Sequence, residues 1–120
     1  MTLVDTSVWV HHLRHGNNEL RSLLDNGEVL CHPFILGELA CGSIPNRIEV
    51  LDLLKALPLA SIAEHDEVMH FLHEKRLYGR GLGWIDLHLL ASASLSKATL
   101  WTIDRALRVG FEIVAGPARP

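Results

Sequence analysis

Apolar residues along this chain occur in short continuous runs and in longer stretches with helical spacing. Short runs bounded by turn or cap residues predict buried strands. The predicted strands cover residues 3–4, 28–31, 57–62, 99–103 and 111–114. Pro58 places the third of these at a sheet edge or near the start of its strand, because proline cannot donate a backbone hydrogen bond.

Stretches with apolar residues three or four positions apart predict the helices. Asn26-Gly27 and Gly42 supply stop signals between them. The predicted helices begin near Asp5, Leu20, Pro33, Pro45, Glu64 and Ile85, and a short one follows Asp104. Segment 85–95 is apolar or small at nearly every position, which is typical of a helix in the protein interior.

The predicted strands and helices alternate along the chain. The expected fold class is therefore α/β, with a central, mostly parallel sheet and helices on both faces. A length of 120 residues suits one compact domain, and no linker, repeat or low-complexity tract interrupts it. We expect a single domain over residues 1–120.

The composition is that of a globular protein, with 48% hydrophobic and 21% charged residues. No apolar run approaches the ~20 residues that span a bilayer, and the N-terminus does not resemble an export signal. The two cysteines form no disulfide framework, which fits a reducing compartment. We expect a cytoplasmic protein.

Four acidic residues stand where an apolar element starts, ends or turns: Asp5, Glu38, Asp86 and Asp104. Asp5 and Asp104 each follow a predicted strand, and the carboxyl ends of parallel strands collect ligands. A carboxylate avoids apolar surroundings unless it has a partner, because it loses hydration there. One shared divalent cation is the simplest partner for all four.

Each of these carboxylates also has a simpler interpretation. Asp5 and Asp104 could be helix N-caps, and Glu38 could be an exposed residue on an amphipathic helix. Asp86 could be a first-turn acid favoured by the helix dipole. The shared cation is preferred because it accounts for the four positions together.

The net charge and two hydroxyl groups bear on the hypothesis of a shared cation. The net charge of −3 does not by itself indicate a nucleic-acid binder, although a cation that masks four carboxylates would make the balance slightly positive. Ser7 and Thr102 place hydroxyls next to two of the acids, where they could orient a carboxylate or a metal-bound water.

Other residues give weaker signals. The histidine pairs 11/15 and 70/73 have helical spacing, but zinc usually needs three or four protein ligands. The tryptophans lie in apolar contexts, so we expect them in the core rather than as stacking surfaces for bases. Four arginines could contact phosphates: Arg14, Arg21, Arg76 and Arg80.

Four segments carry a family resemblance. They are Val-Asp-Thr-Ser-Val-Trp at 4–9, Gly-Glu-Leu at 37–39, Asp-Leu-His-Leu-Leu-Ala at 86–91 and Thr-Ile-Asp at 102–104. Together, and in this order, they resemble the PIN-domain ribonucleases, most closely the VapC toxins of bacterial toxin–antitoxin pairs. The resemblance extends from Thr2 to about Val114.

The resemblance implies a PIN-like three-layer sandwich and an endoribonuclease that depends on Mg²⁺ or Mn²⁺. Its acidic quartet matches Asp5, Glu38, Asp86 and Asp104, and its supporting hydroxyls match Ser7 and Thr102. The residues would hold the metal, and a metal-activated water would hydrolyse the RNA phosphodiester. The resemblance also implies a small antitoxin partner and a homodimer.

Two other functions stay open from the sequence. The acidic pocket could be a non-catalytic module that docks a basic partner. The chain could also be a metal-dependent phosphatase or a receiver-like domain built on a similar sheet. A receiver usually has paired acids near its first strand, whereas Asp5 stands alone there.

Overall fold

The computed structural model of the protein describes residues 1–116, and these form seven helices and three strands. In chain order the elements are β1 (Thr2–Val4), α1 (Thr6–His15), α2 (Asn18–Asp25), β2 (Val29–Leu30), α3 (Pro33–Cys41), α4 (Arg47–Lys55), α5 (His65–Glu74), α6 (Trp84–Ser96), β3 (Thr99–Trp101) and α7 (Arg105–Ala115). Within residues 1–116, no helix is both long and apolar enough to cross a bilayer.

The sheet is parallel throughout and has the strand order β2-β1-β3. Thr2 of the central strand pairs with Val29 on one side and with Thr99 on the other. Leu3 and Val4 are completely buried, as expected for a short central strand with both edges paired. This confirms the predicted α/β class.

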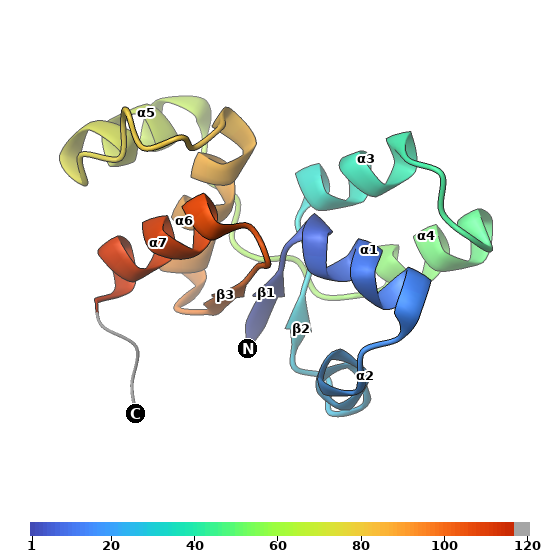
Figure 1. Ribbon diagram of the computed structural model, residues 1–120. Coiled ribbons are helices and arrows are strands. Elements are labelled where there is room, and N and C mark those ends of the chain that lie inside the picture. The colour runs from blue at the N-terminus through green and yellow to red at the C-terminus, as the bar shows by residue number, and fades with distance from the viewer. Residues whose placement is uncertain (117–120) are drawn as a thin grey trace.

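Two groups of helices enclose the sheet (Figure 1). Helices α1 to α4 gather on the β2 side, and α5 to α7 gather on the β3 side. Helix α6 is the most buried helix, with every residue from Leu87 to Ala93 inside the protein. It packs against α5, α7 and β3, as its uniformly apolar sequence predicts.

The prediction of a last strand over residues 111–114 is wrong. Helix α7 continues through this segment to Ala115. Leu107 and Gly110 are buried, and Phe111 and Val114 pack against the core. These positions follow the i, i+3, i+4, i+7 spacing of an amphipathic helix, which outweighs the β-branched residues near the end of the segment.

The predicted strand over residues 57–62 is also wrong. The structure keeps only an isolated parallel bridge between Cys31 and Leu59. Cys31 N donates to Pro58 O at 2.9 Å, and Ala60 N donates to Cys31 O at 2.9 Å. Pro58 has no N–H to extend this ladder, so the segment adds one bridge at the edge of the sheet and no full strand.

Candidate active site

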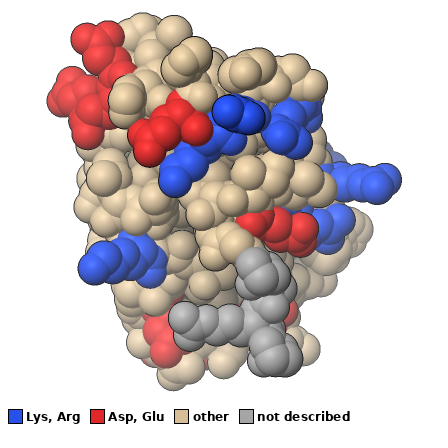
Figure 2. Space-filling model, turned by 90° about the vertical axis from the view of Figure 1, so that its left-hand side faces the viewer, with Lys and Arg blue, Asp and Glu red and all other residues tan. Residues whose placement is uncertain are grey.

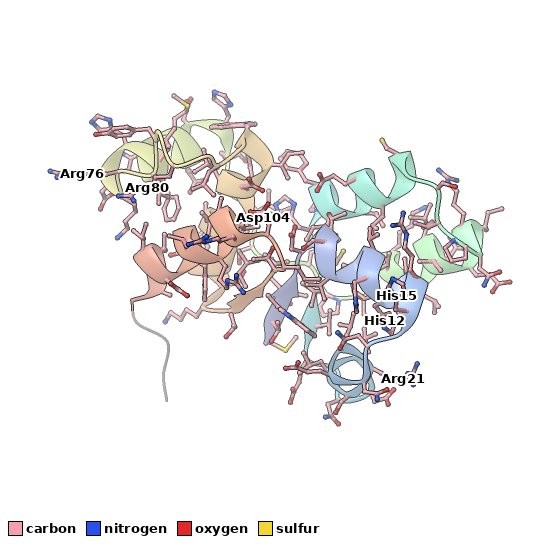
Figure 3. All side chains as sticks on the ribbon, in the orientation of Figure 1. His12, His15, Arg21, Arg76, Arg80 and Asp104 are labelled. Atoms are coloured by element: carbon pink, nitrogen blue, oxygen red, sulfur yellow. The ribbon has the colours of Figure 1, made fainter. Side chains whose placement is uncertain are left out.

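The strand order places a crevice at the carboxyl end of β1. The chain leaves β1 toward β2 on one side, whereas β3 lies on the other side, so the connections diverge at this point. Such a switch point is where open parallel sheets bind ligands. Asp5 directly follows β1, and Asp104 begins α7 just after β3. Figure 3 shows Asp104 in the middle of the molecule, between the two groups of helices.

Asp5 is a buried carboxylate that two hydroxyls hold in place. Ser7 Oγ and Thr102 Oγ1 both donate to Asp5 Oδ2, each at 2.7 Å. The same hydroxyls accept backbone N–H groups, Ser7 from Ile103 at 3.1 Å and Thr102 from Asp104 at 3.0 Å. This network joins the β1–α1 corner to the β3–α7 corner and fixes the orientation of Asp5.

Glu38 enters the site from α3. Thr6 Oγ1, in the first turn of α1, donates to Glu38 Oε1 at 2.8 Å. Helices α1 and α3 pack against each other, so this bond spans the two helices at the end nearest Asp5. Glu38 is exposed but is held by a residue adjacent to Asp5 in sequence.

Asp86 is the third residue of α6, and its Oδ2 accepts the Gly83 N–H at 2.8 Å. Burial raises the pKa of the Asp86 carboxyl; the hydrogen bond from Gly83 lowers it, and the charges of Asp104 and Asp5 raise it further. The structure therefore brings three of the predicted acids close enough for their charges to interact. Like charges in this position are stabilised by a cation.

One feature is common to the four carboxylates. Each accepts protein hydrogen bonds through one oxygen: Asp5 Oδ2, Glu38 Oε1, Asp86 Oδ2 and Asp104 Oδ1. The second oxygen of each accepts no hydrogen bond from the described residues. An oxygen that is oriented through its neighbour but left without a donor is suited to bind a cation.

The simpler interpretations hold in part. Asp104 does cap α7, because its Oδ1 accepts the Leu107 N–H at 2.9 Å, but its other oxygen is free for a second role. Asp5 precedes α1 and yet makes no side-chain cap bond, so the N-cap interpretation fails for Asp5. Glu38 is hydrogen-bonded rather than merely solvated.

The donor set fits a hard divalent cation. It consists of carboxylate oxygens, which Mg²⁺ and Mn²⁺ prefer, and contains no thiolate or imidazole. In the part of the chain that the structure describes, no three Asp, Glu, His or Cys side chains lie close enough together to complete a ligand cage. Mg²⁺ commonly binds through one or two carboxylates and keeps several waters, so a partial set is compatible with it.

Neither histidine pair forms a second centre. The rings of His11 and His15 lie tilted against each other with centroids 5.1 Å apart, and His70 contacts Glu74 at 3.0 Å instead of His73. Both cysteines are free thiols, Cys31 buried and the other exposed.

Sequence reasoning missed three features of this region. Thr6 is a partner of Glu38, and His32 caps α3 by accepting the Phe34 N–H on Nδ1 at 3.0 Å. Trp84 was expected in the core but is 36% exposed. The Thr6–Glu38 bond and the exposure of Trp84 depend on which helices meet, which local pattern does not reveal. The sole local signal was His32 directly before Pro33, a position typical of an N-cap.

The sequence was compared with known proteins. The model of the PIN domain matches residues 2–111, a range that contains all four carboxylates. The chain belongs to the PIN-domain family. Its parallel three-stranded sheet and enclosing helices are the expected PIN-like architecture.

Two relatives are similar to this PIN domain over nearly its whole length. Both are named Ribonuclease VapC32, one from Mycobacterium tuberculosis strain CDC 1551 / Oshkosh and one from strain ATCC 25618 / H37Rv. Each is 49% identical over 109 residues, which cover 90% of this chain and 88% of the relative.

Proposed function

We propose that this PIN domain is a VapC-like endoribonuclease that uses Mg²⁺ or Mn²⁺ to hydrolyse RNA phosphodiesters. The observation that carries the proposal is the group of interacting carboxylates at the switch point, each oriented through one oxygen. The extensive similarity to proteins named Ribonuclease VapC32 supports RNA as the substrate.

Asp5, Glu38, Asp86 and Asp104 would hold the cation. A bound divalent ion would lower the pKa of water, orient the phosphate and neutralise charge on the leaving oxygen. Burial is the main cause of the raised pKa of Asp86, and the cation would relieve the repulsion by Asp104 and Asp5 that raises this pKa further.

The rest of the site serves to hold these acids still. Ser7 and Thr102 fix one oxygen of Asp5, so its other oxygen has a defined direction. Thr6 does the same for Glu38, and the Gly83 N–H does so for Asp86. Supporting hydrogen bonds of this kind typically change metal affinity or activity by about 10–100-fold when removed.

The surface carries basic as well as acidic side chains, and basic side chains could contact the phosphates of RNA. Figure 2 shows Lys and Arg side chains beside a group of acids on the face to which α5 and α7 contribute. Arg76 and Arg80 follow α5 and are exposed (Figure 3), and Arg80 Nε donates to Arg76 O at 2.9 Å. They stay candidates for phosphate contacts away from the carboxylates.

Product analysis tests the proposed chemistry. Attack by water should give fragments with a 5′-phosphate and a 3′-hydroxyl, in Mg²⁺ or Mn²⁺ but not in EDTA. The chain also has eight histidines, and acid–base catalysis by imidazoles with attack by the RNA 2′-hydroxyl would need no metal and would give cyclic phosphates. Cleavage that persists in EDTA with cyclic ends would contradict the proposal.

The VapC similarity also leads us to propose a toxin role with a small protein antitoxin. An antitoxin could lay an apolar helix on the toxin and place an arginine on the carboxylates. Co-expression with a small adjacent gene should give a stable complex without ribonuclease activity, and the toxin should form homodimers. Recovery of fully active, uncomplexed toxin from such cells would contradict the antitoxin proposal.

A further inference from the structure

Five basic side chains lie on two segments that meet beside the carboxylates. Lys75, Arg76 and Arg80 follow α5, whereas Arg105 and Arg108 belong to the first four residues of α7. All five are exposed. Figure 2 shows Lys and Arg side chains gathered on the face to which α5 and α7 contribute. We call these five residues the basic tract.

The two segments are packed against each other. A Cβ atom added at Gly81 would lie 4.0 Å from the Cβ atom of Ala106, and one added at Gly110 would lie 3.2 Å from Leu82 Cδ1. The loop after α5 therefore rests on the first two turns of α7. Figure 1 shows this loop, in yellow to orange, on the same side of the sheet as α7.

The basic tract begins directly at the carboxylate site. Arg105 follows Asp104, and Arg108 lies almost one turn further along α7. Arg80 belongs to the loop that rests on α7, and its Nε donates to Arg76 O at 2.9 Å. Figure 3 shows Asp104 at the inner end of this path and Arg76 and Arg80 at its outer end. Positive charge thus extends from the active site across the loop to the end of α5.

Local stability does not account for these cations. The first four residues of α7 include Arg105 and Arg108 and no acid, although the helix dipole disfavours positive charge at this end. Arg76 has a φ of 54°, in the left-handed conformation that favours glycine or asparagine after a helix. Within residues 1–116, no member of the basic tract forms an ion pair with Asp or Glu. Their charges are therefore available to a ligand.

We propose that the basic tract binds the sugar–phosphate backbone of RNA on one side of the scissile phosphate. The inference rests on the proposed ribonuclease function. It adds the residues that attract a polyanion to an acidic site and the path that the RNA follows away from it. Contacts to phosphates position a nucleic acid but do not read its sequence, so the tract should bind RNA of any sequence.

The chemistry of the tract favours a phosphate backbone. Four of its five members are arginines, whose guanidinium groups bind phosphate oxygens through two parallel hydrogen bonds. The tract is also continuous with the carboxylates. An RNA whose scissile phosphate lies at Asp104 would present its next phosphates to Arg105 and then to the loop.

The salt dependence of RNA binding tests the tract without requiring cleavage. The probes are two short, fluorescently labelled single-stranded RNAs of the same composition but different sequence. Fluorescence anisotropy in KCl and EDTA, from about 50 to 200 mM salt, would give the dissociation constants. Every chain in this assay carries Asp5→Asn, so that we expect the probes to stay intact.

Removing phosphate contacts should lower the slope of log Kd against log salt by about 0.7 for each contact. We therefore expect Arg80→Gln with Arg105→Gln to lower the slope by about 1.4 for both probes. If the two lines meet near about 1 M salt, binding becomes roughly 60-fold weaker at about 50 mM and about tenfold weaker at about 200 mM.

A matched pair of lysines repeats the test away from α7. Lys75 follows the last residue of α5, and Lys55 is the last residue of α4, in the other group of helices. Both are exposed. Lys75→Gln should lower the slope by about 0.7, whereas Lys55→Gln should leave it unchanged.

Cleavage kinetics give a second measurement in chains that keep all four acids. The tract contacts phosphates that do not react, so its interactions should be nearly equal in the ground state and the transition state. Arg80→Gln with Arg105→Gln should therefore raise KM more than it lowers kcat. A lower kcat with an unchanged KM would overturn the inference.

The binding outcomes separate the inference from the function beneath it. If the arginine variant melts like its parent and keeps the parent's slope, the inference is overturned in favour of an acidic protein partner on this surface. An equal loss in Lys55→Gln and Lys75→Gln, or a loss with only one of the two RNA sequences, would also overturn it. The expected slopes in a chain whose wild type does not cut RNA would support the tract and contradict the ribonuclease.

Discussion

Replacing Thr102 with valine removes one hydroxyl from the base of the site while keeping the shape of the side chain. In the wild type Oγ1 donates to Asp5 Oδ2 at 2.7 Å and accepts the Asp104 N–H at 3.0 Å. Thr102 is 7% exposed, so water cannot easily replace the lost hydroxyl. Valine is β-branched like threonine, which leaves the hydrogen bonds as the main difference.

The size of the effect follows from these two bonds. A hydrogen bond to a charged group contributes about 1.5–3 kcal/mol, and a neutral one about 0.5–1.5 kcal/mol. Ser7 still donates to Asp5 in the variant, which keeps the carboxylate partly satisfied. We therefore expect a loss of about 2 kcal/mol in the free energy of unfolding. For a domain of this length that corresponds to a melting temperature roughly 8 °C lower.

Thermal unfolding in EDTA measures this directly, with Thr99→Val as the control. Thr99 is an exposed residue of β3 whose hydroxyl makes no hydrogen bond to the described residues. Thr102→Val should melt well below both the wild type and Thr99→Val, and it should lose about 10–100-fold in RNA cleavage because Asp5 is less firmly oriented. If the two valine variants melt together, the hydroxyl network does not hold Asp5, and the reasoning about the site's support fails.

Two further predictions concern other residues of the site region. Asp104→Asn keeps the N-cap on Leu107 but removes one like charge. The variant should therefore melt no lower than the wild type in EDTA, and Mg²⁺ should raise its melting temperature less. If the variant melts lower in EDTA and the wild type does not respond to metal, Asp104 is a purely structural acid. Burial lowers the pKa of His32 from 6.5 to about 4 in the folded protein. Between pH 6.5 and 4 the imidazole is therefore protonated in the unfolded chain but neutral in the folded one. The free energy of unfolding should thus fall as the pH falls through this window. His32→Asn keeps a capping side chain and should show a shallower loss of stability from pH 6.5 to 4 in urea titrations, and an unchanged slope would count against the buried neutral imidazole.

Much of the fold could be predicted because local signals agree with the packing. The run at residues 3–4 is a buried strand, and a helix starts directly after it, where expected. Helix α6 could be predicted from its apolar composition, since a helix without a polar face must be enclosed. The strand prediction for residues 111–114 was wrong because their β-branched side chains favour a strand locally, whereas the contacts of Leu107 and Gly110 with the core require a helix.

The candidate site, too, could be predicted from the sequence only in part. Asp5 and Asp104 could be placed together because the carboxyl ends of neighbouring parallel strands meet, and the hydroxyls of Ser7 and Thr102 follow from that placement. The bond between Thr6 and Glu38 and the contact between the rings of Phe34 and His88 could not be predicted. They depend on how α1, α3 and α6 meet across more than thirty residues of sequence, and no local periodicity specifies such contacts.

The central claim is that the interacting carboxylates cut RNA, and rates of RNA cleavage test it most directly. The assay would compare wild type, Asp86→Asn and Asp66→Asn in Mg²⁺, with each protein purified free of any partner. Asp66 is the matched control, because it is an exposed first-turn acid of α5 just as Asp86 is a first-turn acid of α6. We predict that Asp86→Asn loses at least ~10²-fold in rate while Asp66→Asn cuts like the wild type. Equal rates for all three proteins would contradict the account, because the activity would then come from somewhere other than this site.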